Sequence, residues 1–172
     1  MKNNFKQALQ CLLKSEGGFV NHPQDPGGMT NCGVTCKTWA EYCNKSVAQI
    51  SEAEMRSLNA EKVSQLYKEN YWDVCKCDDL PAGIDYMVFD FGVNAGCARS
   101  KKILQRSLGV AEDGVIGANT LKALNSININ SAINAFSLEK EKFYRSLKNF
   151  PAFGKGWLNR ITEVKKNVVL FK

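Results

Sequence analysis

Two carboxylates and a hydroxyl near the start of the chain have the chemistry of an acid–base site. Glu16 and Asp25 are nine residues apart, Thr30 follows five residues later, and no other acidic residue lies between positions 14 and 35. Hydrolysis of a glycosidic bond needs one carboxylic acid that protonates the leaving oxygen and a second carboxylate that activates water or stabilises the sugar cation. We therefore interpret Glu16 as a candidate general acid, Asp25 as the second carboxylate and Thr30 as a holder of the attacking water.

The segment around these residues is unusually rich in turn formers. Residues 14–35 contain the only histidine of the chain, His22, two of its four prolines and five of its thirteen glycines. Glycine and proline at this density fix tight turns and let a backbone approach another group closely. The segment is predicted to hold a defined geometry. The alternative is an ordinary surface glutamate beside a helix end, followed by an Asp-Pro turn.

The helix that must position Glu16 can be read from spacing. Phe5, Ala8, Leu9, Leu12 and Leu13 form one apolar stripe, and Gly17-Gly18 is expected to end the helix. Glu16 then lies on its last turn, where the negative end of the helix dipole disfavours an ionised carboxylate. A general acid must keep its proton until it reacts, so this position suits one.

The rest of the chain is predominantly helical in pattern. Alternation typical of strands is confined to residues 19–35, which predicts a mainly α protein with a small β-hairpin. The helix signals are a short helix over 38–44, a capping box at Ser51 to Glu54, an Asn59 cap, an apolar helix from Pro81 to Gly96, a helix over 99–108, a capped start at Asn119-Thr120, and helices over 131–147 and 156–168.

Composition bounds the class of protein. The 172 residues suffice for one compact unit, and 44% apolar with 23% charged residues is ordinary for a globular chain. No apolar run approaches the roughly 20 residues of a membrane-spanning helix, and residues 1–18 do not form a signal-peptide core. We therefore expect synthesis in a cytoplasm and no stable insertion into a membrane.

The positive charge is concentrated at one end of the chain. Of a net charge of +6, residues 138–172 supply nine Lys or Arg against three acidic residues, and the remainder is balanced. Such a segment could attract an anionic polymer, either nucleic acid, anionic lipid or bacterial cell wall. The other interpretation is a solvated helix face.

The seven cysteines favour reduced thiols. Their number is odd, and a chain made in a cytoplasm keeps thiols reduced. Zinc is the alternative, but the chain has no Cys-x-x-Cys pair and no second histidine to join His22. We expect neither a metal nor another cofactor.

Three stretches together resemble one known family. "EGGFVNHPQDPGG" at residues 16–28, followed by Thr-x-x-Gly-Val-Thr, resembles the opening motif of glycoside hydrolase family 108, the lysozyme-like N-acetylmuramidases of phage endolysins and secretion-activator proteins. "NYWDVCKCDDLPAGIDYMVFDFGVNAG" resembles the core helix of that family, and "LQRSLGVAEDGVIGANTLKAL" its predicted peptidoglycan-binding region. The resemblance runs in order over most of the chain.

The resemblance implies a fold, a reaction and a set of residues. It implies a lysozyme-like α+β fold with a small β-hairpin near the active site, a catalytic region over residues 1–95 and a helical peptidoglycan-binding region over 96–172, packed as one compact unit. It places the general acid on Glu16 and the second carboxylate on Asp25, and a weaker analogy with phage T4-type lysozymes assigns Thr30. Substrate contacts are expected at Asn94, Asp113 and Asn119, although Asn94 could equally cap its own helix.

The implied activity is hydrolysis of the β-1,4 bond between N-acetylmuramic acid and N-acetylglucosamine. The implied partner is peptidoglycan, with no nucleic acid, and the protein is expected to act as a monomer. It is expected to be made in a bacterial cytoplasm and to reach the wall after release by a holin or another route. A lytic transglycosylase, which needs only the glutamate, and a non-catalytic wall-binding or secretion-helper protein are the alternatives.

Overall fold

The structure is a computed structural model that describes residues 4–21 and 28–171. The chain packs as two compact units. The N-terminal unit consists of Lys6–Asn70, and the C-terminal unit runs from Tyr71 onward and includes the first residues through Phe5. The family resemblance implies a different boundary, at residue 95, between its two regions. That boundary stays a prediction.

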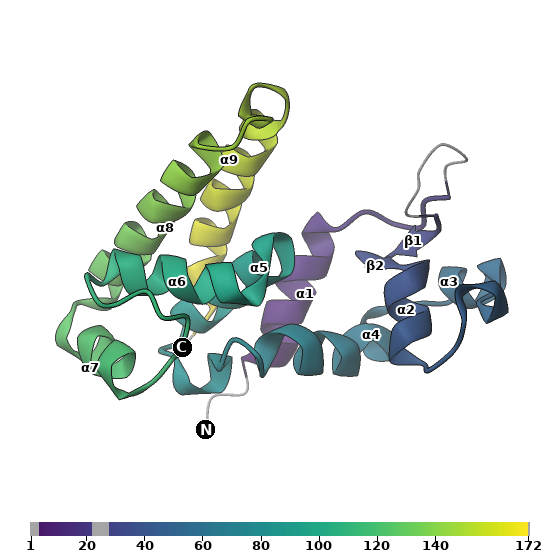
Figure 1. The fold of residues 1–172 in the computed structure, drawn as a ribbon, viewed down its shortest axis with the longest axis horizontal. Helices are drawn as coiled ribbons and strands as arrows, with labels where there is room; N and C mark the ends of the chain where they lie inside the picture. Colours follow the sequence, from purple (N-terminus) through teal and green to yellow (C-terminus); the bar gives the residue numbers. More distant parts are fainter. Residues whose placement is uncertain (1–3, 22–27, 172) are drawn as a thin grey trace. The chain divides into compact units, whose positions relative to one another are not determined.

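The N-terminal unit combines short helices with one hairpin (Figure 1). Its elements are α1 (Phe5–Ser15), which starts at the last residue of the other unit, β1 (Thr30–Asn31), β2 (Val34–Thr35), α2 (Cys36–Tyr42), η1 (Val47–Gln49), α3 (Glu52–Arg56) and α4 (Ala60–Tyr67). Their apolar faces form its core, which includes Leu9, Leu12, Val34, Met55, Val63 and Leu66, each at most 3% exposed. The apolar stripe predicted for α1 is confirmed.

The hairpin turns within two residues. Thr30 pairs with Thr35 and Asn31 with Val34, so that only Cys32 and Gly33 lie in the turn. Both have positive φ angles, 51° and 72°. Two left-handed residues produce the turn whose twist matches that of the flanking strands, and glycine adopts this conformation without strain.

Helix caps in this unit follow local signals with one exception. Asn59 accepts a hydrogen bond from the Lys62 backbone, as predicted, and Ser51 accepts one from the Glu54 backbone. The predicted capping box at Ser51 is nevertheless wrong in its second half. The Glu54 carboxylate instead accepts hydrogen bonds from the Trp39 indole (2.9 Å) and Lys45 (3.2 Å). The indole of Trp39 is buried and needs an acceptor, and Lys45 adds a charge-assisted bond.

The C-terminal unit is almost entirely helical. It contains the end of η2 (Lys68–Trp72), η3 (Cys77–Asp79), α5 (Ile84–Ala95), α6 (Cys97–Ser107), α7 (Ala118–Ser126), α8 (Ile129–Arg145), α9 (Phe150–Asn167) and η4 (Val168–Leu170). α8 and α9 lie side by side along much of their length (Figure 1). The predicted class, mainly α with a small β-hairpin, is confirmed.

Four predicted helix starts, at residues 38, 99, 131 and 156, are too late: α2, α6, α8 and α9 begin at Cys36, Cys97, Ile129 and Phe150. Two more starts are displaced at a glycine N-cap. The apolar helix begins at Ile84 and not at Pro81, because Gly83 is its N-cap with φ +88°; its end at Gly96, with φ +92°, is as predicted. α7 begins at Ala118 with Gly117 as N-cap. Asn119 therefore lies in the first helical turn, and the prediction that it caps the helix is wrong.

A buried ion cluster joins three helices of the C-terminal unit. Asp90 of α5 binds the ammonium of Lys140 on α8 at 2.8 Å and the guanidinium of Arg160 on α9 at 2.8 and 3.0 Å. Asp90 and Lys140 are each only 1% exposed. Burial alone raises the pKa of Asp90, but the charges and hydrogen bonds of Lys140 and Arg160 outweigh burial and hold this pKa below its usual range.

All seven cysteines are free in the structure. Three of them are close together in the C-terminal unit, where the Cys75 thiol hydrogen-bonds both Cys77 and Cys97. Within the described part of the chain, no group of three or more His, Cys, Asp or Glu side chains is arranged to hold a metal ion. Among the same residues, no helix is long and apolar enough to cross a bilayer.

Candidate active site

Glu16 lies directly after α1 and over the turn of the hairpin. α1 ends at Ser15, one residue earlier than predicted, and the Glu16 side chain is half-buried. A Cβ atom added to Gly33 would lie 2.9 Å from Oε2 of Glu16 and 2.7 Å from the hydroxyl of Tyr67. The missing side chain of Gly33 thus leaves the space in which the carboxylate of Glu16 and the phenol of Tyr67 meet the turn.

The turn itself is held from two sides. The Tyr67 hydroxyl, at the end of α4, donates a hydrogen bond to the Cys32 carbonyl at 2.9 Å. Asn31 is 6% exposed, and its amide donates to the carbonyls of Met55 and Leu58 at 2.9 and 3.3 Å. Since these bonds connect the hairpin to α3 and α4, the surface beneath Glu16 is fixed by the fold of the whole unit.

Two residues shortly after Glu16, Phe19 and Val20, are also held in place. Phe19 lies under the guanidinium of Arg56, 3.9 Å from its ring centroid. Val20 and Thr30 exchange two backbone hydrogen bonds of 2.8 Å. The end of α1 before Glu16 and the Phe19-Val20 pair after it therefore have defined positions. A general acid needs such preorganisation.

The structure brings two of the three predicted catalytic residues to one hairpin. Thr30 is the first residue of β1, held by Val20 on one side and Thr35 on the other, and Glu16 lies against the turn of the same hairpin. Asp25 lies outside the described residues. The catalytic roles of Glu16, Asp25 and Thr30 stay predictions.

Replacing Gly33 by alanine is expected to damage the site more than the fold. The new methyl group would come within 3 Å of both the Glu16 carboxylate and the Tyr67 hydroxyl, so these groups must move. We expect Gly33→Ala to reduce wall hydrolysis by up to about 100-fold, the effect of displacing a catalytic group by about 1 Å. Turbidity of a peptidoglycan suspension measures the loss, with thermal melting on the same samples.

Gly28→Ala is the matched control for this change. Gly28 also has a positive φ angle, +66°, but a Cβ atom there meets nothing within 4 Å. Both alanine variants carry the backbone strain of about 1 kcal/mol or more, while only Gly33→Ala contacts Glu16. Equal activities of the two folded variants would show that Gly33 does not make room for a catalytic carboxylate.

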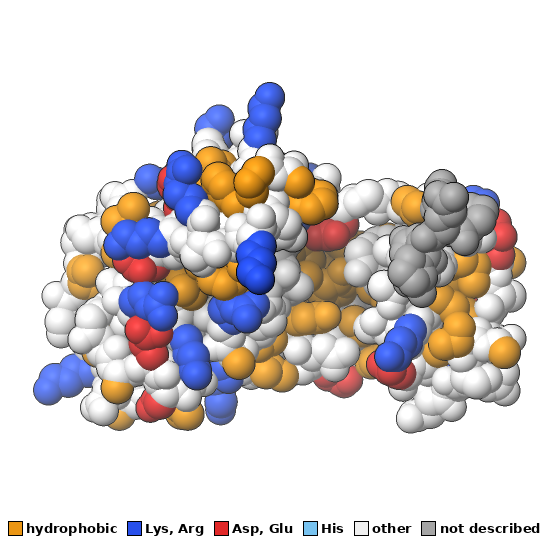
Figure 2. All heavy atoms as spheres, turned by 45° about the horizontal axis from the view of Figure 1, so that its top comes forward, with side chains coloured by type: hydrophobic (Ala, Val, Ile, Leu, Met, Phe, Trp, Pro, Cys, Tyr) orange, Lys and Arg blue, Asp and Glu red, His pale blue; other side chains and the backbone are white. Residues whose placement is uncertain are grey.

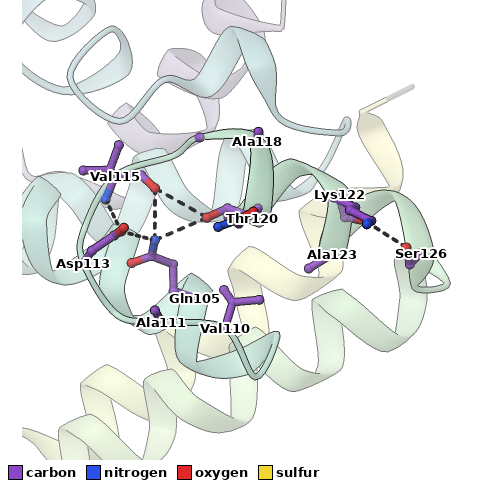
Figure 3. A pocket seen from close by; sticks show the side chains of 12 residues that line it. Gln105, Val110, Ala111, Asp113, Val115, Ala118, Thr120, Lys122, Ala123 and Ser126 are labelled. Atoms are coloured by element: carbon purple, nitrogen blue, oxygen red, sulfur yellow. Dashed lines mark hydrogen bonds between the residues drawn. The ribbon is translucent and has the colours of Figure 1, made fainter.

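A pocket of about 620 Å³ lies beside the N-terminus of α7 in the C-terminal unit (Figure 3). Gln105 of α6 organises its wall: the buried amide donates to Asp113, to the Val115 carbonyl and to Thr120 at 2.6, 3.0 and 3.3 Å. The same side chain accepts from the Gly114 backbone at 2.7 Å. Figure 3 shows the three donated bonds converging on the Gln105 amide. Together with the Gly114 bond, they hold the loop before α7 in place.

The predicted substrate-binding residues divide between two places in the C-terminal unit. Asp113 and Asn119 both line the α7 pocket. The pKa of Asp113 is lowered by hydrogen bonds from the Val115 backbone and from Gln105, so the carboxylate is ionised at neutral pH. Asn94 lies elsewhere, at the end of α5, and its amide donates to the Asp90 carbonyl one turn earlier at 2.6 Å. This bond is the one expected if Asn94 caps its own helix. A role for Asn94 in substrate binding stays a prediction.

Three residues of these sites were not assigned by the sequence. Gly33 was quoted within the motif without a role, Gln105 falls in the predicted helix over 99–108, and Tyr67 was given no role. Gly33 carried a usable signal, because a glycine two residues after a strand predicts a tight turn. The hydrogen bonds of Tyr67 and Gln105 reach partners 35 and 9 residues away in the sequence. The residues next to Tyr67 and Gln105 in the sequence do not indicate these bonds.

A glutamate at a helix end, held over a small β-hairpin in a mainly helical chain, is the arrangement of a lysozyme-like glycoside hydrolase. The family model described as Glycosyl hydrolase 108 matches residues 9–96, and that described as Predicted Peptidoglycan domain matches residues 99–162. Twelve chains of solved structures match. Among them, SagA of Brucella abortus is 39% identical, with a TM-score of 0.82, over 98% of this chain and 95% of that chain. No curated protein matches.

The chain therefore belongs to glycosyl hydrolase family 108. It is a peptidoglycan hydrolase, since it joins the glycoside hydrolase region to a peptidoglycan domain. The expectation of a peptidoglycan partner, taken from sequence resemblance, is confirmed.

Proposed function

We propose that the protein is an N-acetylmuramidase that hydrolyses the β-1,4 bond between N-acetylmuramic acid and N-acetylglucosamine. The observation that carries this proposal is the position of the Glu16 carboxylate over the hairpin turn at Gly33. A general acid must remain within hydrogen-bond reach of the leaving oxygen while the bond breaks. Contacts at Phe19 and between Cys32 and Tyr67 hold the start of the following segment and the hairpin turn in place beside this carboxylate.

In the proposed mechanism, Glu16 gives its proton to the glycosidic oxygen as the bond to the N-acetylmuramic acid anomeric carbon breaks. Asp25 activates the attacking water or stabilises the positively charged sugar, and Thr30 orients that water through its hydroxyl. The second carboxylate distinguishes this mechanism from that of a transglycosylase, which needs only the acid.

The α7 pocket is proposed to bind the wall polymer outside the cleavage site. Its volume of about 620 Å³ suits a sugar or a short peptide. Asp113 and Asn119 present a carboxylate and an amide at its wall, which can accept from and donate to the amides and hydroxyls of peptidoglycan. The family model that matches this region supports the assignment.

The biological role that we propose is that of a bacteriolytic endolysin of a phage. Seven free thiols are compatible with folding in a reducing cytoplasm. The enzyme would then reach the wall of the bacterial host after holin-type or other release, and act there as a monomer.

The test of the proposed reaction is mass spectrometry of fragments that the purified protein releases from peptidoglycan. A muramidase leaves reducing N-acetylmuramic acid ends. Anhydro ends would identify a lytic transglycosylase instead. Sedimentation with the wall without any released fragment would identify a wall-binding protein.

A further inference from the structure

A second pocket, here called the basic pocket, lies between α6 and α8 in the C-terminal unit. Its volume is about 310 Å³, and its lining includes Arg99, Lys102, Arg106, Glu112, Ile103 and Phe143. The lining holds three cations and one carboxylate, and Asp113 and Glu139 lie close enough to interact electrostatically with Lys102 and Arg106. Lys and Arg side chains (blue) are prominent on the surface of this unit in Figure 2.

The three cations differ in their availability to a ligand. Arg106 is occupied by Glu112, to which it donates two hydrogen bonds of 2.9 and 2.7 Å. Arg99 donates one bond to the Ala95 carbonyl at 3.1 Å, which leaves most of its five N–H donors for another partner. Lys102 makes no hydrogen bond or ion pair with any described residue.

An aromatic contact helps to position Arg99. Its guanidinium lies 4.8 Å from the centroid of the Phe143 ring, and this contact restricts the exposed side chain. Lys102 is three residues further along α6 and hence on the same helix face. Two available cations thus flank an apolar floor formed by Phe143 and the buried Ile103.

We infer that the basic pocket binds the carboxylate end of a peptidoglycan stem peptide. A guanidinium fork matches a carboxylate, and an ammonium beside it adds a second charge-assisted bond. The apolar floor suits the methyl group of a terminal alanine. A nucleic acid fits less well, because the pocket offers one aromatic ring and no row of them for stacking. The inference rests on peptidoglycan as the substrate in the proposed function.

The test compares Lys102→Gln with Lys155→Gln, both made in the Glu16→Gln background so that the wall stays intact during binding. Lys155 is an exposed lysine of α9 outside the pocket. We expect Lys102→Gln to lower affinity for intact peptidoglycan about five- to tenfold, the effect of losing one charge-assisted bond. Peptide-free glycan strands should bind both variants equally. Sedimentation at fixed salt measures both affinities.

A second measurement isolates the carboxylate. N-acetyl-D-alanyl-D-alanine should shift the amide NMR signals of Arg99 and Lys102, whereas its C-terminal amide should not. Equal loss of wall affinity in the two glutamine variants, or equal shifts by acid and amide, would overturn the inference. Peptide-dependent binding by a protein that releases no wall fragments would contradict the proposed reaction and still support the basic pocket.

Discussion

Glu16→Gln is expected to reduce peptidoglycan hydrolysis by at least about 100-fold, since general acid catalysis typically contributes 10²–10⁴-fold. Glutamine preserves the size of the side chain that lies over Gly33, but it has no acidic proton for the leaving oxygen. The stability should change little, and removing a negative charge beside the C-terminal end of α1 is favourable for the helix. A turbidity assay and a thermal melt of the same preparation test both expectations.

Glu61→Gln provides the control for this variant. Glu61 is an exposed glutamate on the first turn of α4 in the same unit, so its replacement changes the net charge equally without touching the hairpin. Sedimentation with peptidoglycan should be retained by both variants. If a folded Glu16→Gln protein cleared peptidoglycan as fast as Glu61→Gln, Glu16 would not be the general acid.

Asp90→Asn is expected to cause the largest loss of stability, about 3–5 kcal/mol in the free energy of unfolding. This is the typical effect of removing one partner from a buried ion pair. The substitution leaves the ammonium of Lys140, 1% exposed, and the guanidinium of Arg160 without their anion. The cluster joins α5, α8 and α9, so its loss should lower the stability of these helices. Urea unfolding followed by far-UV circular dichroism, which reports helix content, measures the change.

A surface ion pair on the same helix is the comparison. Glu141 pairs with Arg145 at 2.7 Å on the exposed face of α8, and Glu141→Gln should cost less than about 1 kcal/mol. Comparable losses in Asp90→Asn and Glu141→Gln would contradict the view that the buried cluster holds the three helices together.

The pH dependence of the Asp90 effect has a defined sign. The pKa of Asp90 is lowered in the folded protein, so its contribution to stability is fully present above its unfolded pKa of about 4 and is lost as the pH falls below that value. The difference in unfolding free energy between the parent protein and Asp90→Asn should therefore narrow below about pH 4. A difference that stays constant down to pH 2 would contradict the lowered pKa.

Local signals predicted local structure well. The apolar stripe of α1, the Asn59 cap and the Gly96 end were all predictable, because each depends on residues within about one helical turn. The placement of Glu16 after the first helix followed from the same signals, with an error of one residue at the helix end. The family resemblance added the reaction, which spacing alone does not specify.

Long-range contacts account for what the sequence did not predict. Glu54 appeared to complete a capping box, but the Trp39 indole and Lys45 bind its carboxylate. Asn119 appeared to cap α7, but the helix begins at Ala118 after Gly117, and the Gln105 side chain holds the preceding loop. Partners separated by many residues leave no periodic signal, so such competition becomes visible only in the folded chain.

We propose that Glu16 drives addition of water at the anomeric carbon of N-acetylmuramic acid. Digestion of peptidoglycan in water enriched in the heavy oxygen isotope tests it most directly, with mass spectrometry of the fragments from the parent protein and from Glu16→Gln. We expect a mass increase of about two daltons on the reducing N-acetylmuramic acid of the parent's products, and background labelling with the variant. Label on N-acetylglucosamine, or equal labelling by both proteins, would contradict it.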